Sequence, residues 1–91
     1  MDIYNLSVGQ FVYSKSGRDK GLPFVVVAVK DNYLWLCDGK IRPANRPKKK
    51  KLMHVQPVKI IDENLKTKIT EGQQITDSDL RKALLQLINK D

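Results

Sequence analysis

The sequence predicts a small, mainly β, barrel-like domain followed by a helical extension. Three observations lead to this expectation. Short segments rich in β-branched and aromatic residues occupy residues 1–60, and turn signals separate them. No helical pattern lies between these segments, which excludes a parallel βαβ architecture. Apolar spacing typical of helices occurs only after residue 61. We therefore expect a β-barrel in residues 1–60 and a helical extension packed on or beside it in residues 61–91.

The expected strands are short and closely connected. They cover residues 9–15, 23–30, 33–37, 40–42 and 52–58. The second strand, PFVVVAVK, is an unbroken apolar run, which suggests that both of its faces are covered, as in a small closed barrel. Asp31 and Asn32 form a tight hairpin turn after it, and Asp38 and Gly39 form a second turn.

Two helices are expected after the strands. The first covers residues 62–70, with Leu65 and Ile69 on one face, and ends before Gly72. The second begins at Thr76, whose side chain can cap it, and has acidic residues in its first turn. Its apolar stripe consists of Leu80, Ala83, Leu84, Leu87 and Ile88. We expect this stripe to cover the barrel.

Composition narrows the class of protein. The chain has 91 residues, enough for one small domain. It has one cysteine and one histidine, so a disulfide framework, a structural zinc site and most metal-hydrolase chemistries are excluded. Its longest apolar run, residues 24–29, is too short to cross a membrane, and its first residues do not resemble a signal peptide. We expect a non-secreted, cytoplasmic protein without a cofactor, a metal or a membrane partner. A monomer is the simplest oligomeric expectation.

Positive charge is concentrated in the first two thirds of the chain. The formal net charge is +7; residues 1–60 hold 12 Lys or Arg and 4 Asp or Glu (12 − 4 = +8), and residues 61–91 hold 5 and 6 (5 − 6 = −1). The segment 40–51, KIRPANRPKKKK, has seven cations and no acid. A solubilising loop is the simplest explanation of such a run. Seven cations exceed what solubility needs, so the run favours a polyanionic partner.

A charged, glycine-bounded loop connects the first two expected strands. It lies within VGQFVYSKSGRDKG, residues 8–21, which the apolar segment FVVV follows. Strand, loop and strand resemble the KOW motif of ribosomal proteins and transcription elongation factors, in which a glycine follows a basic residue, as Gly21 follows Lys20 here. The similarity continues through Asp38-Gly39, KKKKLMHV and ITDSDLRKAL, so it covers nearly the whole chain. The chain is thus similar to small bacterial KOW-domain RNA-binding proteins related to large-subunit ribosomal proteins.

This resemblance implies a small SH3-like β-barrel whose first loop and basic surfaces contact structured RNA. The residues themselves favour the same partner, because Lys and Arg side chains bind phosphates with little sequence information. The candidate nucleic-acid-binding residues are Tyr13, Lys15, Gly17, Arg18, Lys20, Gly21, Lys40, Arg42, Arg46, Lys48, Lys49, Lys50 and Lys51.

Several other residues have simpler structural explanations. We expect Phe24 and Trp35 to pack in the core, although Trp35 could instead stack on a base. Cys37 is expected to be a buried, inert thiol. His54 has no partner at ligand spacing, so it is not expected to bind a metal. Arg18 and Asp19 could pair and order the first loop.

The sequence favours a non-catalytic RNA-binding protein associated with ribosomal RNA or the translation apparatus. An enzyme would need a nucleophile with its base, paired carboxylates, a phosphate-binding loop or a metal cluster, and the sequence has no such pattern. The alternative is a protein-protein interaction module that binds ribosomal or transcription proteins. The low aromatic content, two Phe, one Trp and three Tyr, speaks against a peptide-binding groove. Nonspecific binding of duplex DNA is a third possibility.

Overall fold

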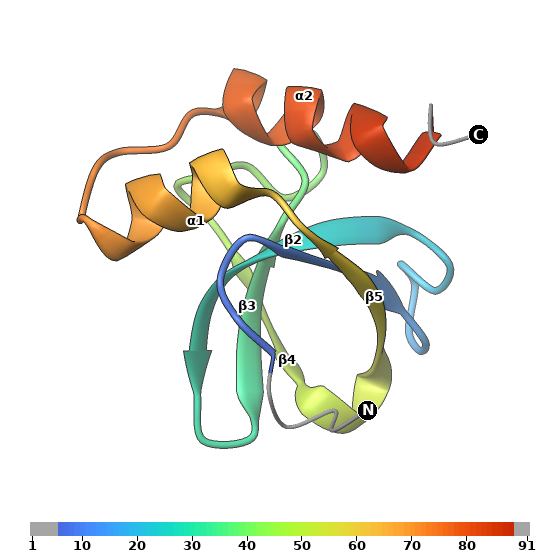
Figure 1. Cartoon of the computed structure of the whole chain (residues 1–91). Helices are drawn as coiled ribbons and strands as arrows, with labels where there is room; N and C mark the ends of the chain where they lie inside the picture. Colours follow the sequence, from blue (N-terminus) through green and yellow to red (C-terminus); the bar gives the residue numbers. More distant parts are fainter. Residues whose placement is uncertain (1–5, 89–91) are drawn as a thin grey trace.

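The computed structural model describes residues 6–88, excepting the side chain of Ile88, and within this range the chain forms five strands and two α-helices (Figure 1). The strands are β1 (Gln10–Ser14), β2 (Pro23–Lys30), β3 (Tyr33–Cys37), β4 (Lys48–Lys51) and β5 (Val55–Ile61). The helices are α1 (Glu63–Thr70) and α2 (Asp77–Ile88), and a 3-10 turn, η2 (Leu52–His54), connects β4 to β5. The expectation of a mainly β fold with a helical extension is confirmed.

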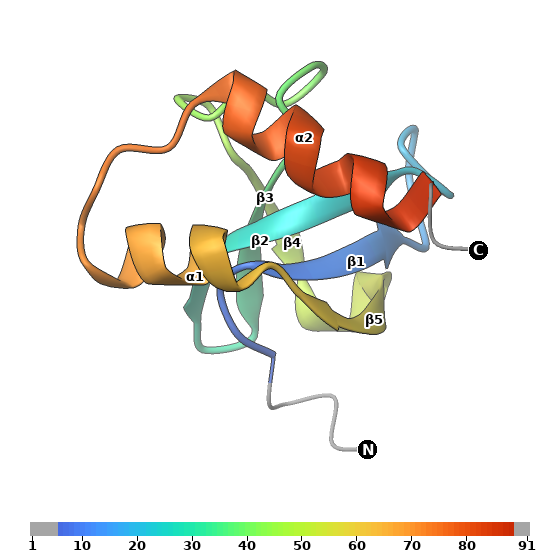
Figure 2. The same cartoon turned by 45° about the horizontal axis from the view of Figure 1, so that its top comes forward.

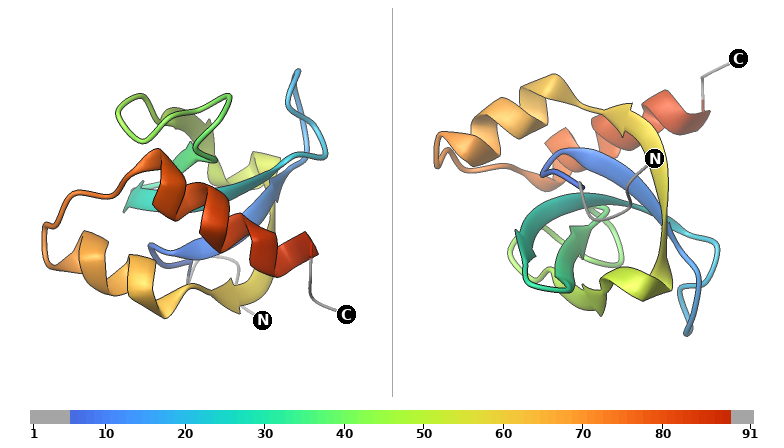
Figure 3. Two further views of the ribbon diagram at one scale, coloured as in Figure 1. Left: turned by 90° about the horizontal axis from the view of Figure 1, so that it is seen from above. Right: turned by 60° about the horizontal axis from the view of Figure 1, so that its bottom comes forward.

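The strands form one antiparallel sheet in the order β4-β3-β2-β1-β5. This sheet is open, because β4 and β5 stand at its two ends and are joined through η2. It is strongly bent, so that β4, η2 and β5 come round toward each other in a barrel-like shape (Figure 3). Its concave side encloses one core, and its convex side carries the helices (Figures 1 and 2).

Successive side chains of β2 point to opposite faces of the sheet, and the buried residues accordingly form two clusters. Phe24 and Val26 belong to the concave cluster, with Leu6, Val12, Leu34, Leu36 and Val55. Val25 belongs to the convex cluster, with Phe11, Cys37, Leu65, Leu80, Ala83 and Leu84. Both faces of β2 are therefore covered at its start, as its unbroken apolar run predicts. The expectation fails at its end, where Ala28 and Val29 are exposed.

Most expected strands are confirmed, and two corrections are needed. The strands over 23–30 and 33–37 occur with the predicted bounds, and Asp31 takes a positive φ of 56° in the hairpin turn between them. Residues 40–42 are not a strand; they belong to the loop between β3 and β4. The fourth strand is instead the lysine run 48–51, which pairs with β3 residue by residue. The last strand was expected over 52–58 but runs over Val55–Ile61, because η2 occupies the start of the expected segment.

Both expected helices are confirmed, and so is the predicted cap of the second at Thr76; the first is capped by Asp62, which was expected to be its first residue. The Asp62 side chain accepts a hydrogen bond from the Leu65 N–H at 3.0 Å at the start of α1. At the start of α2, the Thr76 hydroxyl accepts from the Asp79 N–H (3.1 Å), and the Asp79 carboxylate accepts from the Thr76 N–H (3.0 Å). This reciprocal pair satisfies two backbone donors that the helix leaves unpaired.

The start of α2 is anchored to the loop that connects β3 to β4. The Arg81 guanidinium donates to the Gly39 carbonyl at 2.7 Å, and the Asp77 carboxylate accepts from the Ala44 N–H at 2.7 Å. Gly39 has a φ of +78°, and a Cβ at this position would stand 2.5 Å from the Asp77 carbonyl oxygen. Only glycine allows this turn to approach the helix so closely. These contacts place the β3–β4 loop beside α2.

Within residues 6–88, no helix combines the length and the apolar character that a membrane crossing requires.

Candidate nucleic-acid interface

The loop between β1 and β2 is fixed by a buried carboxylate, Asp19. Its Oδ1 accepts a hydrogen bond from the Ser14 hydroxyl at 2.7 Å and from the Lys50 ammonium at 3.1 Å. Its Oδ2 accepts from the Lys48 ammonium at 2.8 Å. Lys50 also donates to the Ser16 carbonyl at 2.9 Å. Two ion pairs therefore connect the loop to the edge strand β4, and no pattern in the sequence predicts them.

The pKa of Asp19 reflects this environment. Burial alone would raise it, but the hydrogen bonds from Lys48, Ser14 and Lys50 and the positive charge of Lys50 lower it well below the usual range of an aspartate. Asp19 is consequently ionised at any pH near neutrality. The expected pair between Arg18 and Asp19 is not formed, because the lysines of β4 occupy the carboxylate.

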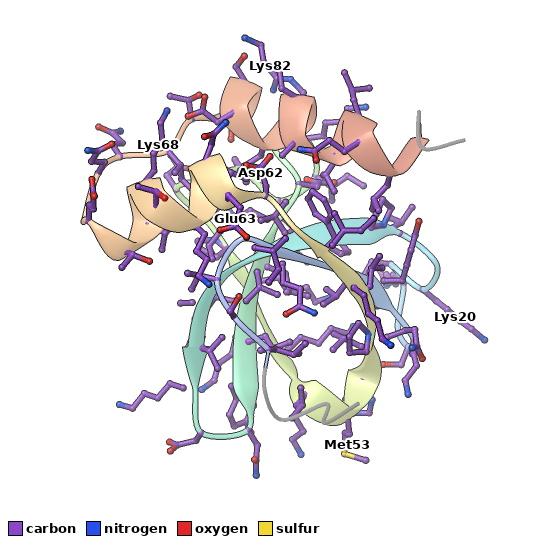
Figure 4. The ribbon with its side chains drawn as sticks, in the orientation of Figure 1. Lys20, Met53, Asp62, Glu63, Lys68 and Lys82 are labelled. Atoms are coloured by element: carbon purple, nitrogen blue, oxygen red, sulfur yellow. The ribbon has the colours of Figure 1, made fainter. Side chains whose placement is uncertain are left out.

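With Asp19 turned inward, the loop presents its cations to solvent. Lys15, Arg18 and Lys20 are all exposed, and Lys20 projects away from the body of the protein (Figure 4). Gly21 has a φ of +88°, and a Cβ built on it would meet nothing within 4 Å. The glycine therefore serves the turn and leaves open space beside the backbone, where a partner can approach closely.

The other two candidate residues of this region lie nearby. Gly17 is exposed, has a φ of +81°, and accepts a hydrogen bond from the Lys20 N–H at 3.3 Å. Tyr13 is partly buried on β1, opposite Pro23 and Gln56. The structure thus brings together the candidates of the first loop at one end of the sheet.

The four lysines of β4 divide into two pairs with different environments. Lys48 and Lys50 lie opposite Leu36 and Leu34, which belong to the concave core. Lys50 is only 8% exposed. Lys49 and Lys51 lie opposite Trp35 and Tyr33 and are exposed on the convex side. Only the second pair is available to a partner, so the lysine run is not the uniform basic arm that the sequence suggested.

Trp35 does not pack in the core, contrary to expectation. It belongs to neither hydrophobic cluster and is partly buried on the convex face, as Tyr33 is. The Lys49 ammonium lies 4.3 Å from the centroid of the Tyr33 ring and 5.6 Å from that of Trp35. This geometry is that of a cation-π contact. Phe24, by contrast, is fully buried as predicted.

The remaining candidate cations lie on the β3–β4 loop. Lys40 and Arg46 are exposed, and Arg42 is partly buried. Asp38 holds this turn, because its Oδ1 accepts hydrogen bonds from the N–H groups of Lys40 (2.9 Å) and Arg42 (2.8 Å). The interpretation of Asp38 as a turn former is confirmed. This loop is anchored to α2, and Lys40 lies beside that helix.

A groove of about 550 Å³ lies between this loop and α2. Its walls include Leu22, Ile41 and Leu85, which are 36%, 63% and 50% exposed. Lys40 and Lys82 contribute positive charge to its lining. No pattern in the sequence indicates this groove, because its residues come from three distant segments.

Cys37 is buried in the convex cluster, as predicted. Burial raises the pKa of its thiol to about 11, and the neighbouring carboxylates of Asp38 and Asp77 add to the effect. Such a thiol is a poor nucleophile at neutral pH. In the described part of the chain, no group of His, Cys, Asp or Glu side chains has the arrangement of a metal site.

Comparison with protein-family models and with curated proteins gave no match to this chain.

Proposed function

We propose that this chain is a non-catalytic, KOW-type RNA-binding module that associates with ribosomal RNA or the translation apparatus. The supporting observation is the charge on the exposed surface of residues 6–60. Nine Lys or Arg residues are exposed there: Lys15, Arg18, Lys20, Lys30, Lys40, Arg46, Lys49, Lys51 and Lys59. Asp31 is the one exposed carboxylate in the same range. A polyanion is the partner that such a surface favours.

The excess itself follows from composition, and the fold withdraws two acidic side chains from this surface. Asp19 forms ion pairs with Lys48 and Lys50, and Asp38 accepts backbone hydrogen bonds in its own turn. The two carboxylates thus stabilise the β1–β2 and β3–β4 loops, while most Lys and Arg side chains remain exposed. A loop fixed before binding loses less conformational entropy when it meets an RNA backbone, which favours affinity.

The loop that resembles the KOW motif also supports the proposal. Arg18 and Lys20 are exposed at its tip, and Gly21 leaves open space beside the backbone. The small, strongly bent antiparallel sheet is compatible with the SH3-like barrel that the resemblance implies.

Sedimentation from cell lysate tests the association. We expect the protein to migrate with ribosomal particles at low salt and to be released by high salt or by ribonuclease. Release by salt follows from phosphate contacts, because each contact liberates counterions from the RNA. Migration as a single small protein under every condition would contradict the proposal.

A pair of matched variants tests the surface. Lys20→Gln and Lys82→Gln both remove one exposed positive charge, the first on the β1–β2 loop and the second on α2 (Figure 4). We expect Lys20→Gln to weaken binding to a structured RNA and to reduce the slope of log K against log salt by about 1. Lys82→Gln is expected to leave that slope unchanged. Equal effects of the two variants would show that the loop is not a specific contact.

The groove beside α2 favours a second function, the docking of a protein segment. Three of the exposed large apolar side chains, Leu22, Ile41 and Leu85, converge on it. Lys40, Arg81 and Lys82 are the cations of its lining and Asp38 is its one carboxylate, so the occupant that fits is a peptide with aliphatic and acidic side chains.

Purification after nuclease treatment tests this docking function. We expect one identified protein, with an acidic and aliphatic segment, to be retained by the wild type and lost with Leu85→Lys. Retention that survives the substitution, or no retention after nuclease, would exclude the groove as a docking site.

A further inference from the structure

Two aromatic side chains form a row on the convex face of the sheet, beyond the part that the helices cover. In the register of the sheet, Trp35 lies between Ala28 on β2 and Lys49 on β4. Tyr33 lies between Lys30 and Lys51 in the same way. Each ring is therefore flanked by at least one lysine on a neighbouring strand.

The two rings lie outside the hydrophobic core. Trp35 and Tyr33 belong to neither hydrophobic cluster, although Cys37, on the same face of β3, is fully buried under the helices. The neighbour of Trp35 on β2 is Ala28, so no large side chain lies beside the indole on that strand. Trp35 lines a hollow of about 510 Å³ there, together with Ala28, Val29, Lys30 and Pro47. A partly exposed aromatic ring beside an apolar hollow is typical of a binding surface.

The charges around the rings are almost all positive. Lys30 on β2 and Lys49 and Lys51 on β4 are exposed, and Asp31 is the one acid of the adjoining hairpin turn. The Lys49 ammonium lies over both rings. Aromatic faces next to lysines on flexible stems provide the two contacts that an unpaired nucleotide needs, a stacking surface for the base and a cation for the phosphate.

We propose that Tyr33 and Trp35 stack unpaired nucleobases, so that the RNA bound by this protein has a single-stranded segment beside its structured part. This inference rests on the proposed RNA-binding function and specifies the form of RNA that the surface selects. When a base stacks on the rings, the Lys49 ammonium turns outward to a phosphate. A continuous duplex does not bind in this way, because its base faces are already stacked on each other.

Trp35 is the single tryptophan of the chain, so its fluorescence reports on this surface directly. The protein is titrated with an unstructured RNA oligonucleotide and with an RNA duplex of equal phosphate number. We expect the single strand to quench the fluorescence at saturation and the duplex to bind without comparable quenching. A single-stranded DNA of the same sequence shows whether the surface requires RNA or accepts any unpaired base.

Substitutions then separate stacking from charge. We expect Trp35→Ala and Tyr33→Ala each to weaken binding of the single strand about tenfold, within the range known for base stacking on aromatic side chains, and to leave duplex binding unchanged. Trp35→Phe keeps a ring and is expected to restore most of the affinity. Met53→Ala is the control, because Met53 is a 67% exposed apolar residue on η2 (Figure 4) and does not line the hollow beside Trp35. Thermal unfolding of each variant verifies that the fold is retained.

The outcomes distinguish this inference from the proposed function. Binding of both RNAs with equal affinity, no quenching and no effect of Trp35→Ala would overturn the stacking surface while leaving RNA binding intact. If the wild type binds neither RNA, the proposed function itself fails, and the stacking inference fails with it.

Discussion

At the scale of single residues, Asp19 decides how the candidate interface is built. Its carboxylate is 9% exposed and accepts hydrogen bonds from Ser14, Lys48 and Lys50. A complete network of a buried carboxylate and two lysines contributes little to the free energy of unfolding. Loss of one partner is strongly destabilising, because it leaves an uncompensated buried charge. Asp19 therefore acts mainly on the structure of the loop, and its expected effect on the proposed RNA binding is indirect.

Asp19→Asn tests this role. We expect the substitution to lower the free energy of unfolding by about 3 kcal/mol, because the buried Lys50 ammonium loses its counter-charge. Asp31→Asn makes the same chemical change in an exposed turn with a positive φ, which asparagine adopts readily, and is expected to be neutral. Urea denaturation measures both variants. Equal stabilities of the two would show that the ion pairs contribute nothing to the fold.

The dependence of stability on pH follows from the lowered pKa of Asp19. Its folded-state pKa lies below the unfolded value of about 3.9, so the stabilisation is fully present above pH 4. It decreases as the pH falls through the folded pKa. The difference in stability between the wild type and Asp19→Asn is therefore expected to be constant near neutrality and to narrow below about pH 4.

At the scale of elements, β4 shows how one strand serves two functions. The four residues of β4 are all lysines, so their sequence shows no alternation of apolar and polar residues. The strand nevertheless places their side chains alternately on the two faces of the sheet. Lys48 and Lys50 reach Asp19, whereas Lys49 and Lys51 remain exposed beside the aromatic rings. The strand therefore uses one pair in internal ion pairs and leaves the other pair exposed.

Two double variants with equal charge change separate these functions. We expect Lys49→Gln with Lys51→Gln to weaken RNA binding and to reduce the salt slope by about 2, with little loss of stability. Lys48→Gln with Lys50→Gln is expected to lower the free energy of unfolding by about 3 kcal/mol, because Asp19 is left buried and unpaired. Salt titrations and urea denaturation measure the two effects. Similar results for both double variants would contradict the alternation.

At the scale of the whole molecule, the helices complete the fold by covering the convex side of the sheet. Leu80, Ala83 and Leu84 of α2 share a cluster with Phe11 and Val25 of the strands. The cover ends before Trp35, so the same face of the sheet carries a core at one end and an exposed aromatic surface at the other. The helical extension thus determines which part of the sheet is available to partners.

Leu80→Ala tests this cover. Leu80 is fully buried, so we expect a loss of about 2–5 kcal/mol from the free energy of unfolding. Leu85→Ala removes the same atoms from the same helix at a position that is 50% exposed, and its effect is expected to be below about 1 kcal/mol. Thermal unfolding compares the two. Comparable melting temperatures would mean that α2 is not an integral part of the core.

The sequence by itself determined the features that depend on local chemistry. The hairpin turn at Asp31 follows from turn-forming residues, and the strands beside it follow from β-branched and aromatic side chains. The start of α2 follows from Thr76, whose side chain caps the backbone next to it. The excess of positive charge in residues 1–60 also follows from composition alone. These signals are readable because the residues that cause each feature are neighbours in the chain.

Tertiary structure alone decided which of the candidate residues are available. The pairing of β4 with β3 places four identical lysines alternately on the two faces of the sheet. Two of them, Lys48 and Lys50, form ion pairs with Asp19, which is 31 residues away from Lys50 in the sequence. Trp35 became a surface residue because the helices end their cover before it. Burial and ion pairing depend on contacts between distant segments, and no local pattern in this chain encodes those contacts.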